Sequence, residues 1–374
     1  MRNEQKTNYR WVICSLLFFA TTINYLDRQV LSLTWDEFIK PEFHWNEDHY
    51  GTITGLFSLI YAISMLFAGR FVDWLGSKKG FLWAIGVWSL GACIHALCGI
   101  VTEQYTGLAS AAELAQATGD VVVVIATVSM YAFIVARCVL AIGEAGNFPA
   151  AIKVTAEYFP KKDRAYATSI FNAGASIGAL IAPLSIPPLA KAFGWEMAFI
   201  IIGALGFVWM GFWVFMYEKP EKNARVNQAE LDYILSDKDT DSLPAGASEE
   251  KSSLIRCFMH RQTWAFAFGK FMTDGVWWFF LFWIPSYLNT QFGIKTTDGL
   301  GMALIFTLYA ITMLSVYGGK LPTIIIDKTG KNPYAARMQA MLIFAFIPLI
   351  VLMAQPLGTI SPWFPVILIG LGGA

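Results

Sequence analysis

The chain contains repeated apolar runs, each long enough to cross a lipid bilayer as a helix. About 20 mainly apolar residues span the hydrocarbon core. Apolar residues make up 56% of the 374 positions and charged residues 14%, too little charge to cover a soluble protein of this size. We therefore expect an all-α integral membrane protein. The expected spans lie near residues 11–33, 51–72, 80–101, 125–149, 165–188, 196–217, 263–288, 299–319 and 338–355, and a tenth begins near 361.

Residues 218–262 form the one long polar stretch, and they separate six of these runs from the rest. Two such halves joined by a charged linker are the plan of many secondary transporters, which bind substrate near the midplane between the halves. We expect a six-helix bundle over 1–217, a cytoplasmic linker over 218–262 and a second bundle over 263–374. The last run stops at Ala374 without a polar anchor, so we expect this second bundle to be truncated.

The distribution of Lys and Arg predicts which side of the membrane each loop occupies. With the N-terminus in the cytoplasm, 20 of the 27 basic residues lie on the cytoplasmic side and three lie outside. This is the bias that the positive-inside rule describes. The four basic residues that remain at membrane depth are Arg28, Arg137, Lys153 and Lys270.

Asp27 and Arg28 lie near the end of the first apolar run. An ionised side chain at bilayer depth costs at least ~2.5 kcal/mol, so both should face the protein interior or a water-filled cavity. The simpler alternative is that they mark the helix end and extend to the interface. Arg137 and Glu144 are seven residues apart in the fourth run, which places them on one helix face.

The loop after the second run has the pattern G-x-x-x-D-x-x-G-x-K-K, formed by Gly69, Asp73, Gly76, Lys78 and Lys79. An acid at a helix end and basic residues in a tight turn can form ion pairs with neighbouring helices, and these pairs must break and re-form during a conformational change. The alternative is a basic cytoplasmic loop without a gating role.

This motif resembles the signature of the major facilitator superfamily, and Gly319 with residues 327–331 gives a weaker echo of it after the eighth run. The resemblance implies two six-helix bundles, of which about 10 of 12 helices are present here.

The fourth run, in which Arg137 precedes Glu144 and Pro149 follows, resembles the fourth helix of the anion:cation symporter family within that superfamily. The sequence Tyr-x-Asp-Arg that ends at Arg28 makes the resemblance specific. It implies two crossed ion pairs, Asp27 with Arg137 and Glu144 with Arg28.

A carboxylate released from its Arg in an apolar site can take a proton. We therefore predict that Asp27, Glu144 and Arg137 couple transport to protons. A static network of buried ion pairs, which would stabilise the helices only weakly, is the alternative.

Arg28 is the residue we expect to bind a substrate carboxylate. Its planar guanidinium can hold both carboxylate oxygens and keeps its charge at any working pH. Tyr25 and Tyr61 match tyrosines that the family places at its site, and their hydroxyls could donate to the anion or to sugar oxygens. Both are also compatible with simple helix packing.

The fifth run contains G-x-S-x-G at residues 174–178, the pattern of a hydrolase nucleophile elbow. That motif needs a strand before it and a His partner, so we reject it and expect no enzyme activity. The same residues form G-x-x-x-G, which lets helices pack closely. The surrounding sequence, from Asn172 to Pro183, resembles the hexuronate transporters of the family, and Asn172 could bind a sugar hydroxyl.

The seventh run carries Lys270 and Asp274 four residues apart, a natural contact on one helix face. Trp278 follows within an aromatic cluster, and aromatic faces stack on sugar C–H groups. We predict Lys270 as a second anion contact and Trp278 as a sugar contact, although packing explains most of these rings equally well. His44 and His49 do not have the spacing of metal ligands, and we predict no metal and no cofactor.

Together these features predict a proton-coupled importer of a sugar-acid anion, a hexuronate such as galacturonate or glucuronate, that works by alternating access. We expect a monomer in the bacterial inner membrane with a cytoplasmic N-terminus and no nucleic-acid partner. Three alternatives stay open: sodium as the coupling ion, another organic anion such as a hexonate (galactonate) or an aromatic acid, and a membrane sensor that does not transport.

Overall fold

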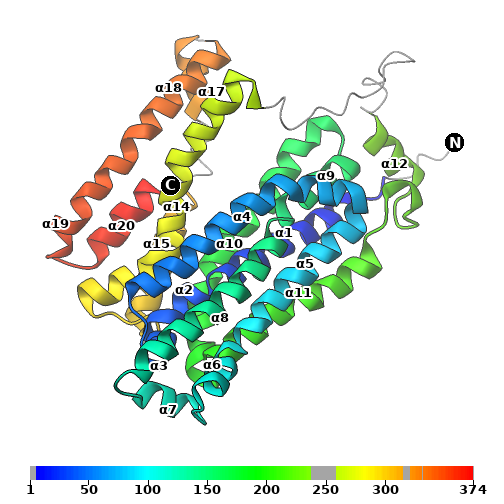
Figure 1. Cartoon of the computed structure of the whole chain (residues 1–374). Coiled ribbons are helices and arrows are strands. Elements are labelled where there is room, and N and C mark those ends of the chain that lie inside the picture. The colour runs from blue at the N-terminus through cyan, green and yellow to red at the C-terminus, as the bar shows by residue number, and fades with distance from the viewer. Residues whose placement is uncertain (1–5, 237–257, 315–320, 331, 374) are drawn as a thin grey trace.

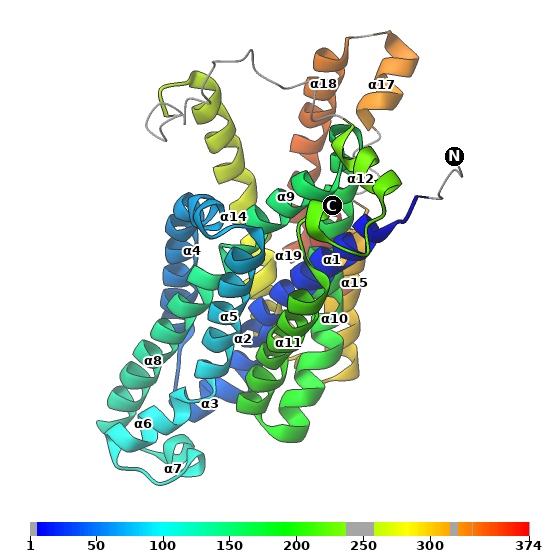
Figure 2. The ribbon, with the colours of Figure 1, turned by 90° about the vertical axis from the view of Figure 1, so that its right-hand side faces the viewer.

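The computed structural model describes residues 6–236, 258–314, 321–330 and 332–373, and over these residues it is helical with no strand. Figures 1 and 2 show the N-terminal segment, α12 (Gln228–Leu235) and α17 (Leu321–Thr329) at one end of the molecule. The short helices α3 (Lys40–Phe43), α6 (Cys98–Thr106) and α7 (Ala111–Gln116) lie at the other end. We call these the inner and outer ends, after the cytoplasmic and external sides that the sequence predicts.

The helices up to residue 216, which we call the first bundle, match the first six predicted spans. The first span is made of successive short helices: α1 stops at Arg28, α2 follows after Gln29, and a π-helical turn, η1, precedes α3. The elements are α1 (Tyr9–Arg28), α2 (Val30–Thr34), η1 (Trp35–Ile39), α4 (Glu47–Leu75), α5 (Ser77–His95), α8 (Val121–Glu144), α9 (Asn147–Tyr158), α10 (Lys161–Phe193) and α11 (Trp195–Met216).

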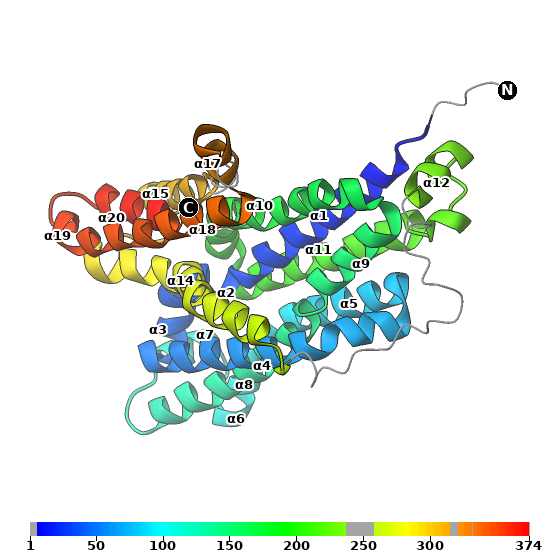
Figure 3. The same cartoon turned by 90° about the horizontal axis from the view of Figure 1, so that it is seen from above.

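The helices from residue 261 onward form a second group. In Figures 1 and 3, α14 lies between α4 of the first bundle and α18. The elements of this group besides α17 are α14 (Arg261–Phe292), α15 (Gly299–Thr312), α18 (Pro333–Phe346), η4 (Ile347–Met353), α19 (Ala354–Gly358) and α20 (Trp363–Gly372).

Several of these helices can cross a membrane. By length and composition five qualify among the described residues, or six if α5 and α6, bent by 43°, count as one span. Two further apolar helices, α15 and α20, are shorter. The predicted span at 299–319 is helical only as far as Thr312, and residues 315–320 lie outside the described ranges.

The small residues of α10 allow it to pack directly against α1. A Cβ atom at Gly178 would come within 2.5 Å of the carbonyl oxygen of Thr22, and one at Gly174 would overlap the carbonyl oxygen of Phe18. Because backbone atoms cannot move aside as a flexible side chain can, only glycine fits at these positions. The G-x-x-x-G pattern therefore serves close helix packing, which fixes the position of α1 and of the charges near its end.

Helix α12, which follows the first bundle, contacts the start of α1 through the buried carboxylate of Glu230. Glu230 accepts hydrogen bonds from the backbone N–H groups of Tyr9 and Arg10, at 3.0 and 3.1 Å, and forms a 3.0 Å ion pair with the Arg10 guanidinium. These N–H groups have no partner within the helix, and an anion there is favoured by the helix dipole.

The contact between α1 and α10 gives a direct test of the fold. Gly178→Leu should lower the melting temperature and the monodisperse yield of the detergent-purified protein, since overpacking of this kind costs about 1–3 kcal/mol. Gly211→Leu on α11 is the matched control, because a Cβ atom at Gly211 meets no atom within 4 Å. Equal melting temperatures for the two variants would contradict the packing described here.

Candidate functional site

The two groups of helices meet at the outer end through a set of polar contacts. The amide of Asn289 on α14 donates to Asp36 at 2.6 Å, and the hydroxyl of Thr297 donates to Glu37 at 2.6 Å. The hydroxyl of Thr296 donates to the carbonyl oxygen of Leu33 at 3.1 Å. We call Asp36, Glu37, Asn289, Thr296 and Thr297 the outer seam. Nothing in the sequence pattern pointed to these residues.

A cavity of about 460 Å³ lies between the first bundle and α14. It combines charged, aromatic and hydroxyl-bearing side chains, and both groups of helices contribute to it. Its size falls in the usual range for small-molecule sites. The lining residues are Tyr25, Arg28, Ser58, Tyr61, Ala62, Met65, Phe148, Lys270, Asp274, Trp277 and Trp278.

Five of the six residues predicted to contact substrate therefore line one cavity, although the helices that carry them are far apart in the sequence. The exception is Asn172, which is exposed on α10 and is not part of this lining. The structure thus brings Tyr25, Arg28, Tyr61, Lys270 and Trp278 together and leaves Asn172 outside the group.

Arg28 is held by Glu144. Its Nε and Nη2 atoms lie 2.8 and 2.5 Å from Oε2 of Glu144, and the two side chains are at most 1% exposed. Nη2 also donates to the side-chain oxygen of Asn24 at 3.4 Å. This is one of the two ion pairs that the family resemblance implied, and it joins α1 to α8.

Aromatic rings surround the Arg28 guanidinium. Its central carbon lies 4.7, 4.8 and 4.9 Å from the ring centroids of Tyr61, Trp278 and Tyr25, and 5.9 Å from that of Phe57. Rings at such distances attract a cation through their faces. Trp278 belongs to α14, so its indole ring, from the second group of helices, lies against the guanidinium of Arg28 in the first bundle.

Three further aromatic residues at this site, Phe57, Phe148 and Trp277, were not predicted from the sequence. Phe57 contacts both Arg28 and Arg137, and Phe148 lines the cavity. The spacing could have found Phe57, because it is four residues before Tyr61 on the same helix, which places both on one helix face. Phe148 lies on α9, after the break that ends α8 at Glu144, so spacing from Glu144 does not place it.

The second implied ion pair, between Asp27 and Arg137, does not form in the structure. Both side chains are buried, and the carboxylate oxygens of Asp27 and the guanidinium nitrogens of Arg137 have no hydrogen-bond partner among the described residues. The Arg137 guanidinium lies 5.2 Å from the ring centroid of Phe57 instead. Asp27 also differs in direction from Arg28, because consecutive helical residues point about 100° apart.

Lys270 and Asp274 form the expected contact on α14, with 2.7 Å between Nζ and Oδ1. Both side chains are about half exposed, 55% and 47%, and both line the cavity. The positive charge of Lys270 is therefore already neutralised by a carboxylate in this structure.

The motif after the second span lies at the inner end. Asp73 forms a 2.9 Å ion pair with Lys153 of α9, and Lys78 forms one with Glu218 at 2.9 Å. Gly76 has a positive φ of 78°, which the turn between α4 and α5 requires. Lys153, assigned to membrane depth from the sequence, thus serves as the partner of the motif's acid.

The other motif residues have fewer contacts. Lys79 is exposed, and a Cβ atom at Gly69 would meet open space. In the weaker echo of the motif, Gly319 and Lys331 lie outside the described residues. A gating role for the motif stays a prediction.

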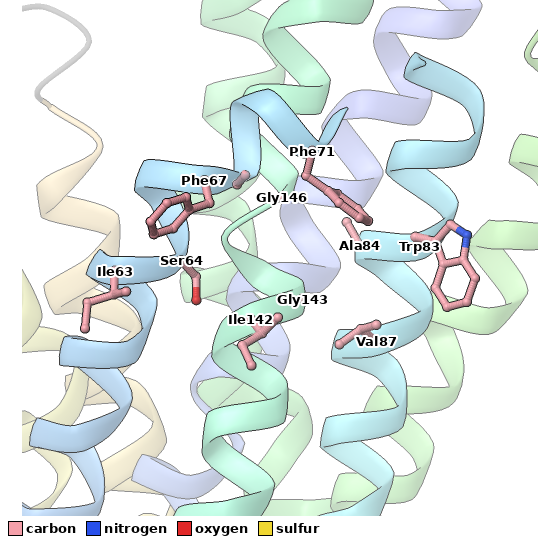
Figure 4. Close-up of a pocket in the computed structure, with 11 residues that line it drawn as sticks. Ile63, Ser64, Phe67, Phe71, Trp83, Ala84, Val87, Ile142, Gly143 and Gly146 are labelled. Carbon is pink, nitrogen blue, oxygen red and sulfur yellow. The ribbon is translucent and has the colours of Figure 1, made fainter. Parts of the chain in front are cut away.

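A separate groove of about 280 Å³ lies between α4, α5 and α8, shown in Figure 4. Its lining has no charged side chain, and Trp83, Phe67 and Ile63 on its rim are exposed. In a membrane-spanning protein such a surface faces lipid, so this groove is a poor candidate for binding an anion. Its residues are Ile63, Ser64, Phe67, Ala68, Phe71, Trp83, Ala84, Val87, Ile142, Gly143 and Gly146.

Three bacterial transporters have sequences similar to this chain. The hexuronate transporter of Escherichia coli (strain K12) is 28% identical over 368 residues, covering 97% of this chain and 76% of the relative. The galacturonate transporter of Dickeya chrysanthemi is 28% identical over 313 residues, covering 84% and 81%. A probable galactarate/D-glucarate transporter of Escherichia coli (strain K12) is 29% identical over 294 residues, covering 76% and 61%.

The fold also matches a solved structure. A bacterial homolog of the human lysosomal transporter Spinster, in an inward-facing and unoccupied conformation, superposes with a TM-score of 0.67 at 19% identity, covering 98% of this chain and 73% of that one. The family model of the Major Facilitator Superfamily matches residues 17–374. With its membrane-spanning helices and a cavity between two groups of them, this chain belongs to the major facilitator superfamily and is a transporter, not an enzyme.

Proposed function

We propose that this protein imports a sugar-acid anion, a hexuronate such as galacturonate or glucuronate, by proton-coupled symport and alternating access. The observation that carries the proposal is the buried ion pair between Arg28 and Glu144 at the wall of the aromatic cavity. The similarity to hexuronate and galacturonate transporters at 28% identity supports this class of substrate.

Arg28 is the proposed anchor for the substrate carboxylate. Its guanidinium can bind both oxygens of a carboxylate side by side, which a lysine cannot do. The rings of Tyr61, Trp278 and Tyr25 around it give surfaces on which the C–H faces of a sugar can stack, and the tyrosine hydroxyls can bond to its oxygens.

Proton coupling follows from competition for the same cation. In the structure Glu144 occupies the Nε and Nη2 atoms of Arg28, which are donors that a substrate carboxylate would use. Two carboxylates beside one guanidinium repel each other, and protonation of Glu144 removes this repulsion. The other oxygen of Glu144, Oε1, is buried and has no hydrogen-bond partner among the residues that the structure describes, so a proton can be added there without breaking a hydrogen bond seen here.

Asp27 is the proposed second proton acceptor. An ionised carboxylate that is buried and unpaired costs more than a neutral one, and the oxygens of Asp27 have no hydrogen-bond partner in the described structure. More than one proton per monovalent anion would give the loaded carrier net positive charge. A negative-inside membrane potential would then drive import.

Alternating access requires that the contacts between the two groups of helices open on one side and form on the other. The outer seam joins the two groups at the outer end, through Asp36 and Glu37 on η1 and their partners on α14 and directly after it. A ligand shifts such an equilibrium only by its different affinities for the two states. We propose that substrate binding at Arg28 supplies this difference.

Replacing the anchor tests substrate binding. Arg28→Ala should abolish galacturonate binding by the purified protein, and Arg28→Lys should weaken it by about tenfold or more, since the charge remains but the paired hydrogen bonds are lost. Lys191→Ala, an exposed basic residue on α10, is the control and should keep the wild-type Kd. A wild-type Kd for Arg28→Ala would remove Arg28 from the site.

Replacing the proton acceptor tests coupling. Glu144→Gln cannot ionise, so galacturonate binding should lose most of its pH dependence. Accumulation in proteoliposomes driven by an imposed pH gradient should fall strongly, because only Asp27 remains to take up a proton, while exchange of labelled for unlabelled substrate continues. Asp120→Asn, at the exposed outer end of the same helix, is the control. Uptake by the wild type that follows a sodium gradient and ignores the pH gradient would show that the coupling ion is not the proton.

Weakening the outer seam tests alternating access. Glu37→Ala with Asn289→Ala removes hydrogen bonds to charged groups, each worth about 1.5–3 kcal/mol, so the population open to the outside should rise at least about tenfold. Spin labels at Asp48 and Leu300, exposed at the outer end, report this population by their distance distribution. The control is Glu42→Gln, whose bond to Trp195 lies within the first bundle. Equal shifts in both variants would contradict a gate at the seam.

A further inference from the structure

The cavity contains a second charged pair that the proposed transport mechanism does not use. Lys270 and Asp274 on α14 lie 2.7 Å apart, and both side chains line the cavity that Arg28 also lines. A carboxylate is unexpected in a site for anions, because it repels the ligand. Its presence beside the second cation calls for a physical explanation.

The position of this pair can be derived from the geometry of α14. Trp278, Asp274 and Lys270 are spaced by four residues on one continuous helix, so they share a face. With a rise of about 1.5 Å per residue, Asp274 is about 6 Å and Lys270 about 12 Å along the helix axis from Trp278. The ring of Trp278 lies 4.8 Å from the Arg28 guanidinium. The pair therefore begins about one turn from the level of Arg28.

That separation matches the length of a six-carbon acid. Five carbon–carbon bonds of about 1.5 Å place the two ends of an extended six-carbon chain roughly 6 Å apart. If the first carboxylate of a substrate binds Arg28, the far end of the molecule comes close to Asp274 and Lys270. A hydroxyl or ring oxygen there can hydrogen-bond to either side chain. A second carboxylate meets the negative charge of Asp274.

The charges of the cavity favour a ligand with one negative charge. When Glu144 is protonated, Arg28 has one uncompensated positive charge. Lys270 offers none, because Asp274 neutralises it. A dicarboxylate must either displace Asp274 from Lys270 or lie next to it, and both arrangements cost free energy.

We propose that Asp274 determines the charge selectivity of the site: it admits sugar acids with one carboxylate and excludes aldarates, which have a carboxylate at each end. This inference rests on the proposed function, in which Arg28 binds the first carboxylate. Lys270 then acts mainly as the partner of Asp274 and becomes an anion contact only when that partner is removed.

The test compares galactonate with galactarate, two open-chain six-carbon acids that differ only at one end, where galactonate has a hydroxymethyl group and galactarate a second carboxylate. The Kd of each is measured by equilibrium binding to the purified full chain for wild type, Asp274→Asn and the double variant Lys270→Gln with Asp274→Asn. In wild type, galactonate should bind more tightly than galactarate. In Asp274→Asn the ratio of the galactarate Kd to the galactonate Kd should fall about tenfold, because Lys270 is free to bind the second carboxylate.

The double variant separates this effect from a general change in the cavity. Without Lys270 the ratio should return toward the wild-type value. Three results would each overturn the proposal. The ratio could stay unchanged in Asp274→Asn, it could fall equally in the double variant, or the wild type could bind galactarate as tightly as galactonate. Other results would contradict the proposed function itself. In that case the wild type binds none of galactonate, galactarate and galacturonate, or Arg28→Ala binds these acids as the wild type does.

Discussion

The arrangement of the cavity depends on the ion pair between Arg28 and Glu144. A guanidinium keeps its charge at every physiological pH, so burying it at bilayer depth without a partner is costly. In this structure the partner is a carboxylate of another helix, and aromatic rings from α1, α4 and α14 cover the remaining surface of the cation. An anion that enters the cavity can bind Arg28 fully only by taking the place of Glu144. In the proposed mechanism, substrate binding and the protonation of Glu144 are therefore linked by competition for the same nitrogen atoms.

The Arg28 guanidinium also contacts the second group of helices. Trp278, a residue of α14, lies against the Arg28 guanidinium, and the outer end of α14 is bound to η1 through Asn289 and Asp36. A change in what Arg28 binds thus alters a contact of the helix that also forms part of the outer seam. In the proposed mechanism, this one continuous helix of 32 residues couples occupancy of the cavity to opening of the outer end.

The features that could be predicted from the sequence are those that depend on spacing along one helix. Apolar run length gave most of the spans, and the i, i+4 spacing of Lys270 and Asp274 gave their contact. Partners from different helices were harder. The pair of Arg28 with Glu144 was predicted from a family resemblance. The companion pair of Asp27 with Arg137 does not form, and the Arg137 guanidinium lies near the ring of Phe57. Asp36, Glu37 and their partners depend on how α14 meets η1, which no local pattern encodes.

The central claim is that a substrate carboxylate replaces Glu144 on Arg28. A structure of the protein determined with galacturonate bound tests this most directly. The account predicts a carboxylate oxygen of the ligand within hydrogen-bond distance of the Arg28 guanidinium, and Oε2 of Glu144 moved beyond 4 Å, the limit of an ion pair. A ligand carboxylate bound elsewhere, with the contact between Arg28 and Glu144 unchanged, would contradict it.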